Sequence, residues 1–198
     1  MRKLFYIGLL TFIISGVIHS QTKTNAEKYY SLIEKSVSAV IGGKVQKESK
    51  VFIEPVMPER FQLLKNSLIE KTAKAALVNP QKENSDYIFT YTVEDAKVIY
   101  GETFTKSFLG RNYVEREVSL KGFAGIHKPT ENVTAGRFDY SEKDTVEYRS
   151  LKELGNSAYP FTNPEIPSEP FFSSVWEPVI AIGVAITTVY LLFTVRSK

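Results

Sequence analysis

The C-terminal stretch WEPVIAIGVAITTVYLLFTVRSK, residues 176–198, constrains this chain more than any other feature. It contains no charged side chain from Val179 to Val195. A helix rises about 1.5 Å per residue, so this run is just long enough to cross the apolar part of a bilayer when the flanking residues help. We therefore expect a transmembrane helix over residues 175–195 and a cytoplasmic tail over residues 196–198.

The residues at the two ends of this run are of types that anchor a helix in a membrane. Trp176 suits the headgroup region, Pro178 is tolerated in a first helical turn, and Arg196 and Lys198 can remain in water. The run itself carries only Tyr190 and three threonines as polar side chains. The alternative is a buried C-terminal helix of a soluble core, which normally has a more polar face.

Small residues within the run predict lateral packing between helices. Gly183 is followed four residues later by Thr187, and Ala181 and Ala185 repeat that spacing. Such spacing lets two helices approach closely in a membrane. We expect the span to pack against itself or another span through the Gly183 face, and a lone anchor is the alternative.

The N-terminal stretch MRKLFYIGLLTFIISGVIHSQ has the pattern of a signal peptide. Two basic residues precede an apolar run that ends at Ile18, and small or polar residues follow. We expect a signal peptide over residues 1–20, with cleavage after Ser20. No cysteine follows the apolar run, which excludes a lipoprotein anchor. Together the two ends predict an exported domain over residues 21–155, in the periplasm or outside the cell.

The charge and cysteine content of the body exclude several classes of function. The chain has 25 basic and 22 acidic residues. Arg2, Lys3, Arg196 and Lys198 belong to the terminal segments, which leaves 21 basic against 22 acidic residues, a net charge of −1. With no run of basic residues in the body, we expect no nucleic-acid partner. The absence of cysteine excludes disulfides, thiol nucleophiles and thiolate metal sites.

Hydrophobic periodicity predicts helices in the first part of the body. Thr24 and Glu27 have the spacing of a capping box, and apolar residues recur at helical spacing until Gly42 and Gly43. The segment KVFIEPV, residues 50–56, predicts a short buried strand. A second helix is expected from Pro58 until the Asn-Pro pair at residues 79–80.

After these helices the polar and apolar residues alternate with a period of two, which predicts the strands of a sheet. In residues 85–93, SDYIFTYTV, every second side chain belongs to the same face of a strand. After Glu94 and Asp95 the apolar positions shift by one residue, which predicts a bulge or bend. Residues 113–126 alternate again, and two weaker strand candidates follow. We therefore expect an α+β domain in which two helices pack on a mostly antiparallel sheet.

Prolines are concentrated between the domain and the apolar run. The segment from residue 156 to residue 178 contains five of them. We expect an extended Pro-rich spacer over residues 156–174 that links the domain to the membrane helix. Binding of these prolines to the aromatic groove of a partner is the alternative.

The residue sets that support catalysis are sparse in the body. His127 is its only histidine, so no histidine metal triad and no Cys–His pair can form, and its position beside Pro129 indicates a turn. We therefore expect no catalytic residue, no metal and no cofactor. The carboxylate pairs Glu94/Asp95 and Glu115/Glu117 leave a carboxylate-based hydrolase as an alternative.

Two further features concern binding and modification. The alternating aromatic residues Tyr87, Phe89 and Tyr91 would suit a face that contacts a ligand or partner, which makes a ligand-binding module the second alternative. Asn132 begins the sequence Asn-Val-Thr, which fits the N-glycosylation acceptor pattern.

The segments VFIEPV, SDYIFTYTV and VSLKG resemble the periplasmic α/β domain of the curli-secretion-channel and flagellar-accessory lipoprotein families over about residues 50–127. The chain departs from that pattern because it lacks the lipid-attachment cysteine and has an apolar C-terminal run. The resemblance implies a role in envelope assembly. We therefore expect a non-enzymatic, membrane-anchored extracytoplasmic protein that scaffolds or assists assembly of an envelope complex, with the lipid bilayer and other envelope proteins as its partners.

Overall fold

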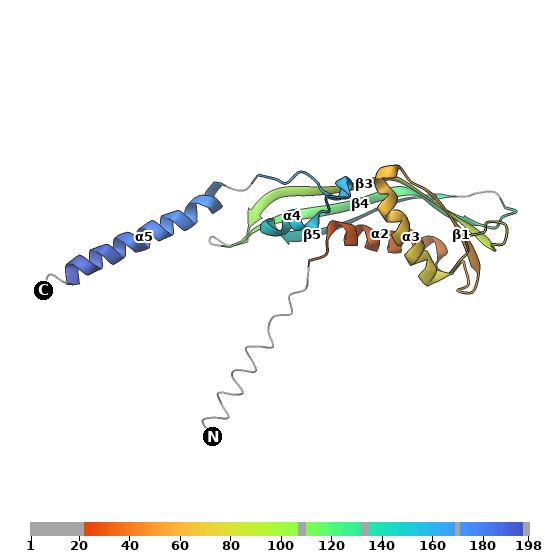
Figure 1. The fold of residues 1–198 in the computed structure, drawn as a ribbon, viewed down its shortest axis with the longest axis horizontal. Coiled ribbons are helices and arrows are strands. Elements are labelled where there is room, and N and C mark those ends of the chain that lie inside the picture. The colour runs from red at the N-terminus through yellow and green to blue at the C-terminus, as the bar shows by residue number, and fades with distance from the viewer. Residues whose placement is uncertain (1–21, 107–109, 132–134, 169–170, 196–198) are drawn as a thin grey trace, which may run out of the picture.

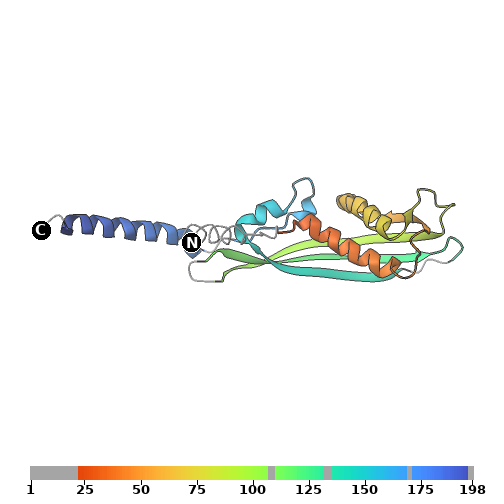
Figure 2. The ribbon, with the colours of Figure 1, turned by 90° about the horizontal axis from the view of Figure 1, so that it is seen from below.

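The computed structural model describes residues 22–106, 110–131, 135–168 and 171–195. Within the last of these ranges the side chains of residues 179–194 are described. Figures 1 and 2 show an elongated molecule in which helices cover one face of a long twisted sheet and a final helix projects from one end.

The described residues form a five-stranded sheet with the order β2-β1-β3-β4-β5. Its strands are β1 (Lys50–Val56), β2 (Leu77–Val78), β3 (Tyr87–Thr105), β4 (Asn112–His127) and β5 (Gly136–Glu147). Strand β1 is parallel to both of its neighbours, whereas β3, β4 and β5 form an antiparallel meander. The expected mostly antiparallel sheet is therefore wrong: the sheet is mixed, because a helical crossover returns the chain from β1 to β2 in the same direction.

The α-helices of the described chain are α2 (Asn25–Ile41), α3 (Gln62–Ala75), α4 (Leu151–Leu154) and α5 (Phe171–Val195), and short 3₁₀ turns include η1 (Glu59–Phe61) and η3 (Pro160–Thr162). The capping box of α2 is confirmed. The Thr24 hydroxyl accepts a hydrogen bond from the Glu27 amide at 3.2 Å, and the Glu27 carboxylate accepts one from the Thr24 amide at 2.7 Å. The helix ends before Gly42, as its sequence predicts.

Helix α3 is shorter than the sequence predicts. It ends at Ala75, and Leu77 and Val78 then pair with Lys50 and Val51 of β1. Backbone pairing with a neighbouring strand satisfies the amide groups there as well as a helix would, so the tertiary contact ends the helix.

The core lies between the sheet and the helix pair α2 and α3, which cover the same face (Figure 2). Its fully buried side chains include Tyr29, Leu32, Ile33, Phe61, Leu64, Leu68, Phe89, Tyr91 and Leu120. The opposite face of the meander is crossed by ion pairs, such as Lys121–Asp139 at 2.9 Å and Lys143–Glu117 at 3.3 Å. The sheet therefore has one apolar and one solvated face, as antiparallel sheets commonly do.

The predicted irregularity of the long strand is confirmed. The register of β3 against β4 shifts between Val93 and Asp95, where the apolar phase slips in the sequence. A second shift lies between Tyr100 and Thr103, and the strand continues to Thr105. Pairing with β4 holds this polar segment extended.

Two parts of the expected C-terminal architecture are wrong. No helix in the described ranges is both long enough and apolar enough to cross a bilayer, so the transmembrane helix expected over residues 175–195 is not found.

The Pro-rich stalk is the second correction. The Phe161 ring lies 5.3 Å from the ring centroids of both Tyr29 and Phe61, and Thr162 is fully buried. Burial of these groups holds residues 156–168 against the domain instead of extending them into solvent. From Phe171 the chain is already helical.

Candidate functional site

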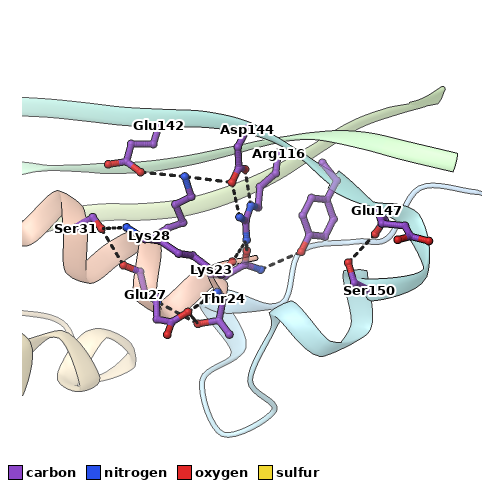
Figure 3. Close-up of polar contacts among 12 residues, drawn as sticks. Lys23, Thr24, Glu27, Lys28, Ser31, Arg116, Glu142, Asp144, Glu147 and Ser150 are labelled. Atoms are coloured by element: carbon purple, nitrogen blue, oxygen red, sulfur yellow. Dashed lines mark hydrogen bonds and ion pairs between the residues drawn. The ribbon is translucent and has the colours of Figure 1, made fainter. Parts of the chain in front are cut away.

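A buried arginine organises the polar interior at the start of α2 (Figure 3). Arg116 lies on β4 between Val114 and Val118, on the face that points to the core, and its side chain has no exposed surface. The guanidinium donates to both carboxylate oxygens of Asp144, at 2.8 and 2.6 Å. It also donates to the Lys23 carbonyl and the Asn25 side-chain oxygen, each at 2.8 Å.

Lys28 adds a second cation to this cluster. Its ammonium lies 3.1 Å from Glu142 and 3.2 Å from Asp144. Partial burial acts to raise the pKa of Asp144, but the hydrogen bonds and positive charges of Arg116 and Lys28 outweigh burial and hold that pKa below its usual range. Asp144 therefore carries its negative charge at neutral pH.

Asn25 extends the network to two further segments. Its amide donates to the Tyr100 hydroxyl at 3.0 Å and to the Thr162 carbonyl at 2.8 Å. The cluster thereby joins α2, β3, β4, β5 and η3. Its charged groups are engaged in bonds to one another, so we interpret it as a structural tie, not as a catalytic site.

This cluster was not predicted from the sequence, although one signal was present. Residues 114, 116 and 118 share one face of an alternating strand, so the charge of Arg116 had to be buried and neutralised. The identity of its partners could not be predicted, because Asn25 and Asp144 are distant in sequence.

The cluster is continued by a segment that is bonded to the domain and precedes α5. We use the name strap for residues 156–168. The Tyr148 hydroxyl donates to the Pro167 carbonyl at 2.9 Å, and the Thr103 hydroxyl donates to the Ser168 carbonyl at 3.3 Å. Ile166 packs on a small cluster that includes Val114. The chain is thus held on the domain until Ser168, at the end of the sheet where β3 finishes (Figure 1).

Helix α5 presents an apolar surface that no other described part of the chain covers. Every described side chain from residue 179 to residue 194 is exposed. Ten large hydrophobic residues have between 45% and 76% of their surface exposed: Val179, Ile180, Ile182, Val184, Ile186, Val189, Tyr190, Leu191, Leu192 and Phe193. Five of them are consecutive, so the apolar surface surrounds the helix.

The three threonine hydroxyls of α5 are bonded within the helix. The hydroxyls of Thr187, Thr188 and Thr194 each donate to the carbonyl four residues earlier at 2.8 Å. A threonine bonded in this way presents mainly its methyl group to the surroundings. The surface of α5 therefore suits an apolar environment better than water.

The predicted anchor residues fall on or near this helix. Gly183 and Tyr190 lie on its exposed surface, and a Cβ added to Gly183 would meet no atom within 4 Å. Trp176 and Pro178 belong to α5, but their side chains lie outside the described part of the structure. Arg196 and Lys198 also lie outside the described residues. So does Asn132, the predicted glycosylation site.

The predicted aromatic face is part of the core. Phe89 and Tyr91 are fully buried and Tyr87 is half-buried. The Tyr91 ring packs 5.2 Å from that of Phe138, and its hydroxyl lies 2.7 Å from that of Ser36 on α2. Burial raises the pKa of Tyr91. A ligand therefore cannot reach Phe89 or Tyr91 in this structure.

A hollow of about 330 Å³ lies elsewhere, between the C-terminal half of α2 and strands β4 and β5. Its lining includes Val40 from α2, Lys44 from the turn after that helix, and Arg137, Phe138 and Tyr140 from β5. The lining combines apolar side chains with two cations. It shares none of its residues with the predicted aromatic face.

His127 is not a turn residue, contrary to the expectation. It is the last residue of β4, pairs with Ile88 of β3 and is buried. Its Nδ1 has no hydrogen-bond partner within the described residues. The antiparallel pairing with β3 extends the strand one residue beyond the alternating run.

The carboxylate pairs lie in ion pairs. Glu94 lies 3.8 Å from Arg137, and Glu117 lies 3.3 Å from Lys143. Over the described ranges there is no group of three or more His, Cys, Asp or Glu residues that could hold a metal ion.

Comparisons with known proteins give distant structural likeness only. No protein-family model matches this chain, and no curated protein matches it either. A neuraminyllactose-binding hemagglutinin homolog from Helicobacter pylori is 17% identical, with a TM-score of 0.36, over 59% of this chain and 81% of that one. A minor lipoprotein from Acinetobacter baumannii is 12% identical, with a TM-score of 0.32, over 58% and 84%.

The rare lipoprotein B from Shewanella oneidensis is 9% identical, with a TM-score of 0.26, over 74% of this chain and 93% of that one. With TM-scores below 0.5, these likenesses to bacterial envelope proteins carry no argument about function. They also do not show the curli-secretion or flagellar-accessory family that the sequence resembles.

Proposed function

We propose that this protein is a non-enzymatic extracytoplasmic envelope protein that associates with a lipid bilayer through α5 and holds its α+β domain at that surface to assist assembly of an envelope complex. The observation that carries the proposal is the uncovered apolar surface of α5. Removing a large aliphatic or aromatic side chain from water is favourable by about 1.5–3 kcal/mol. Ten such side chains on one helix favour a lipid environment strongly.

The way α5 is attached supports a holding role. The strap is bonded to the domain at Pro167 and Ser168, and the buried cluster around Arg116 ties the strap to α2 and to the sheet. The chain is thereby held on the domain up to Ser168, three residues before α5 begins. Export is supported by the signal-peptide pattern of residues 1–20.

Liposome flotation tests the proposal. The chain from residue 21 to residue 198 should float with phosphatidylcholine vesicles, and a chain that ends at Ser168 should remain at the bottom of the gradient. If both float equally, α5 is not the lipid-binding element.

A matched pair of substitutions separates lipid binding from general damage. Ile186→Asp places a charge on the apolar surface of α5, and Ile69→Asp places one on an exposed position of α3. A charge in the apolar part of a bilayer is unfavourable by a few kcal/mol, so Ile186→Asp should weaken vesicle binding roughly tenfold or more. Ile69→Asp should leave it unchanged, and equal effects of the two would contradict the proposal.

A second candidate function is the binding of a small amphiphile in the hollow beneath α2. The hollow has the size of a small-molecule site, and its lining pairs the rings of Phe138 and Tyr140 with the cations Lys44 and Arg137. A fatty acid should raise the unfolding temperature of the chain. Ala39→Trp, which fills the hollow from α2, should abolish that rise, and an undiminished rise would exclude this site.

A further inference from the structure

We propose that the end of the β3–β4 hairpin is a second lipid-contact surface, which touches the headgroups of the bilayer with which α5 associates. The surface consists of Phe104, Lys106, Arg111 and Tyr113, and we call it the hairpin surface. The inference rests on the proposed function, because it takes the bilayer to be the environment of α5.

The position of the hairpin surface follows from the strap. The Thr103 hydroxyl donates to the Ser168 carbonyl at 3.3 Å, so the C-terminal end of strand β3 lies against the last described residue before α5. Ser168 and Phe171 are three residues apart, which is at most about 11 Å of chain. Whatever surface receives α5 therefore lies close to the hairpin. In Figures 1 and 2 the β3–β4 end of the sheet points toward the same end of the molecule as α5.

The side chains at this end have the chemistry of a membrane interface. Phe104 is 40% exposed, and its ring lies 6.3 Å from that of Tyr113. The Lys106 ammonium lies 4.7 Å from the centroid of the Tyr113 ring. Exposed aromatic rings next to cations are typical of residues that lie at the level of lipid headgroups, where one part of the side chain meets apolar atoms and another meets water.

The local charge favours anionic headgroups over an acidic partner. From Phe104 to Tyr113 the sequence contains Lys106 and Arg111 and no acidic residue. Arg111 is paired at 3.1 Å with Glu147 of β5, yet most of its side chain remains exposed. Cations close to a membrane surface gain free energy from anionic lipids.

The same attachment determines how far the domain reaches from the membrane. Strand β3 has 19 residues, which at about 3.3 Å each extend over roughly 60 Å. If the hairpin surface lies at the headgroups, the loop that precedes Tyr87 lies at most about 60 Å from the bilayer. The far end of the sheet is then free to meet other envelope components.

Fluorescent labels can test the contact directly, because the chain contains no cysteine. Thr105→Cys places a label beside the hairpin surface, and Glu83→Cys places one at the opposite end of β3; both positions are exposed. Trp176, the only tryptophan of the chain, belongs to α5 and reports on that helix. Each labelled chain from residue 21 to residue 198 would be added to vesicles of phosphatidylcholine and phosphatidylglycerol containing brominated lipid.

We expect brominated lipid to quench Trp176 and the label at residue 105, but not the label at residue 83. A second outcome is that Trp176 is quenched, but the label at residue 105 is quenched no more than the label at residue 83. That result would overturn the inference and leave the proposed function standing. If neither Trp176 nor residue 105 is quenched, both fail. Quenching at residue 105 without Trp176 would support the hairpin contact and reject the role of α5.

Charge and apolar contact can be tested together by a double substitution with a matched control. Phe104→Ser with Lys106→Glu alters the hairpin surface, whereas Ile99→Ser with Lys97→Glu makes comparable changes at exposed positions of the same strand. The hairpin variant should bind vesicles containing phosphatidylglycerol roughly tenfold more weakly than the native chain. The control should change binding less than about twofold, and equal losses in the two variants would contradict a specific contact.

Discussion

The Arg116 Nη2 atom lies 2.6 Å from the Asp144 Oδ2 atom, and the two side chains differ in burial. The guanidinium has no exposed surface, whereas 29% of the aspartate side chain is exposed. The arginine therefore depends on its partners for charge compensation far more than the aspartate does. Through Asn25 this pair also connects the start of α2 to the strap that precedes α5.

Loss of the aspartate charge should destabilise the fold. Asp144→Asn would leave the buried guanidinium without its compensating carboxylate, and breaking such a pair lowers the free energy of unfolding by about 3 kcal/mol. Urea denaturation of the detergent-solubilised chain would measure the change. Asp139→Asn is the control, because its ion pair with Lys121 is largely exposed and should contribute less than about 1 kcal/mol. Equal losses would show that burial of Arg116 is not the cause.

The pH dependence of stability should follow the same pair. Arg116 and Lys28 hold the pKa of Asp144 in the folded protein below that of the unfolded chain, about 3.9. The stabilisation is therefore present above that unfolded value and is lost as the pH falls through the folded value. The difference in unfolding free energy between the native chain and Asp144→Asn should be large at pH 7 and shrink below about pH 4. A difference that stays constant across this range would exclude Asp144 as its source.

Gly122 should tolerate no side chain. A Cβ at this position would overlap the Thr92 carbonyl oxygen of β3 and lie 3.0 Å from the Phe138 ring. Gly122→Ala should therefore lower the free energy of unfolding by about 1–3 kcal/mol, the usual penalty for overpacking. Gly136→Ala is the matched control on β5, since its Cβ would meet nothing within 4 Å, and it should change stability by less than about 0.5 kcal/mol.

Phe161 should hold the strap on the domain. Its ring packs against Tyr29 of α2 and against Phe61, so Phe161→Ala should lower stability by about 2–3 kcal/mol and expose residues 156–168 to faster amide exchange. Hydrogen-exchange mass spectrometry would locate the change. Phe104→Ala removes a more exposed ring and should leave exchange in the strap unaltered. Unchanged exchange in the Phe161 variant would mean that the strap is held by its other bonds.

Several elements could be predicted from the sequence because their causes are local. The capping box of Thr24 and Glu27, the end of α2 at Gly42 and the bounds of β1 depend on residues that are neighbours along the chain. The shift in β3 after Val93 was visible as a slip in apolar phase, because one face of the strand must remain buried. The apolar character of α5 was equally evident, since it depends on composition alone.

Only the tertiary structure decided which segments meet. Leu77 and Val78 ended α3 early because β1 offered backbone partners, and that pairing made the sheet mixed. The Pro-rich segment is held on the domain because the Phe161 ring packs against Tyr29 of α2 and against Phe61, just before α3. Arg116 is buried because it lies on the core-facing side of an alternating strand. Its charge is neutralised by Asp144 and its hydrogen bonds are completed by Asn25, which are 28 and 91 residues away in the sequence and meet only in the folded structure. Long-range contacts of this kind depend on three-dimensional packing, which no periodicity within a single segment encodes.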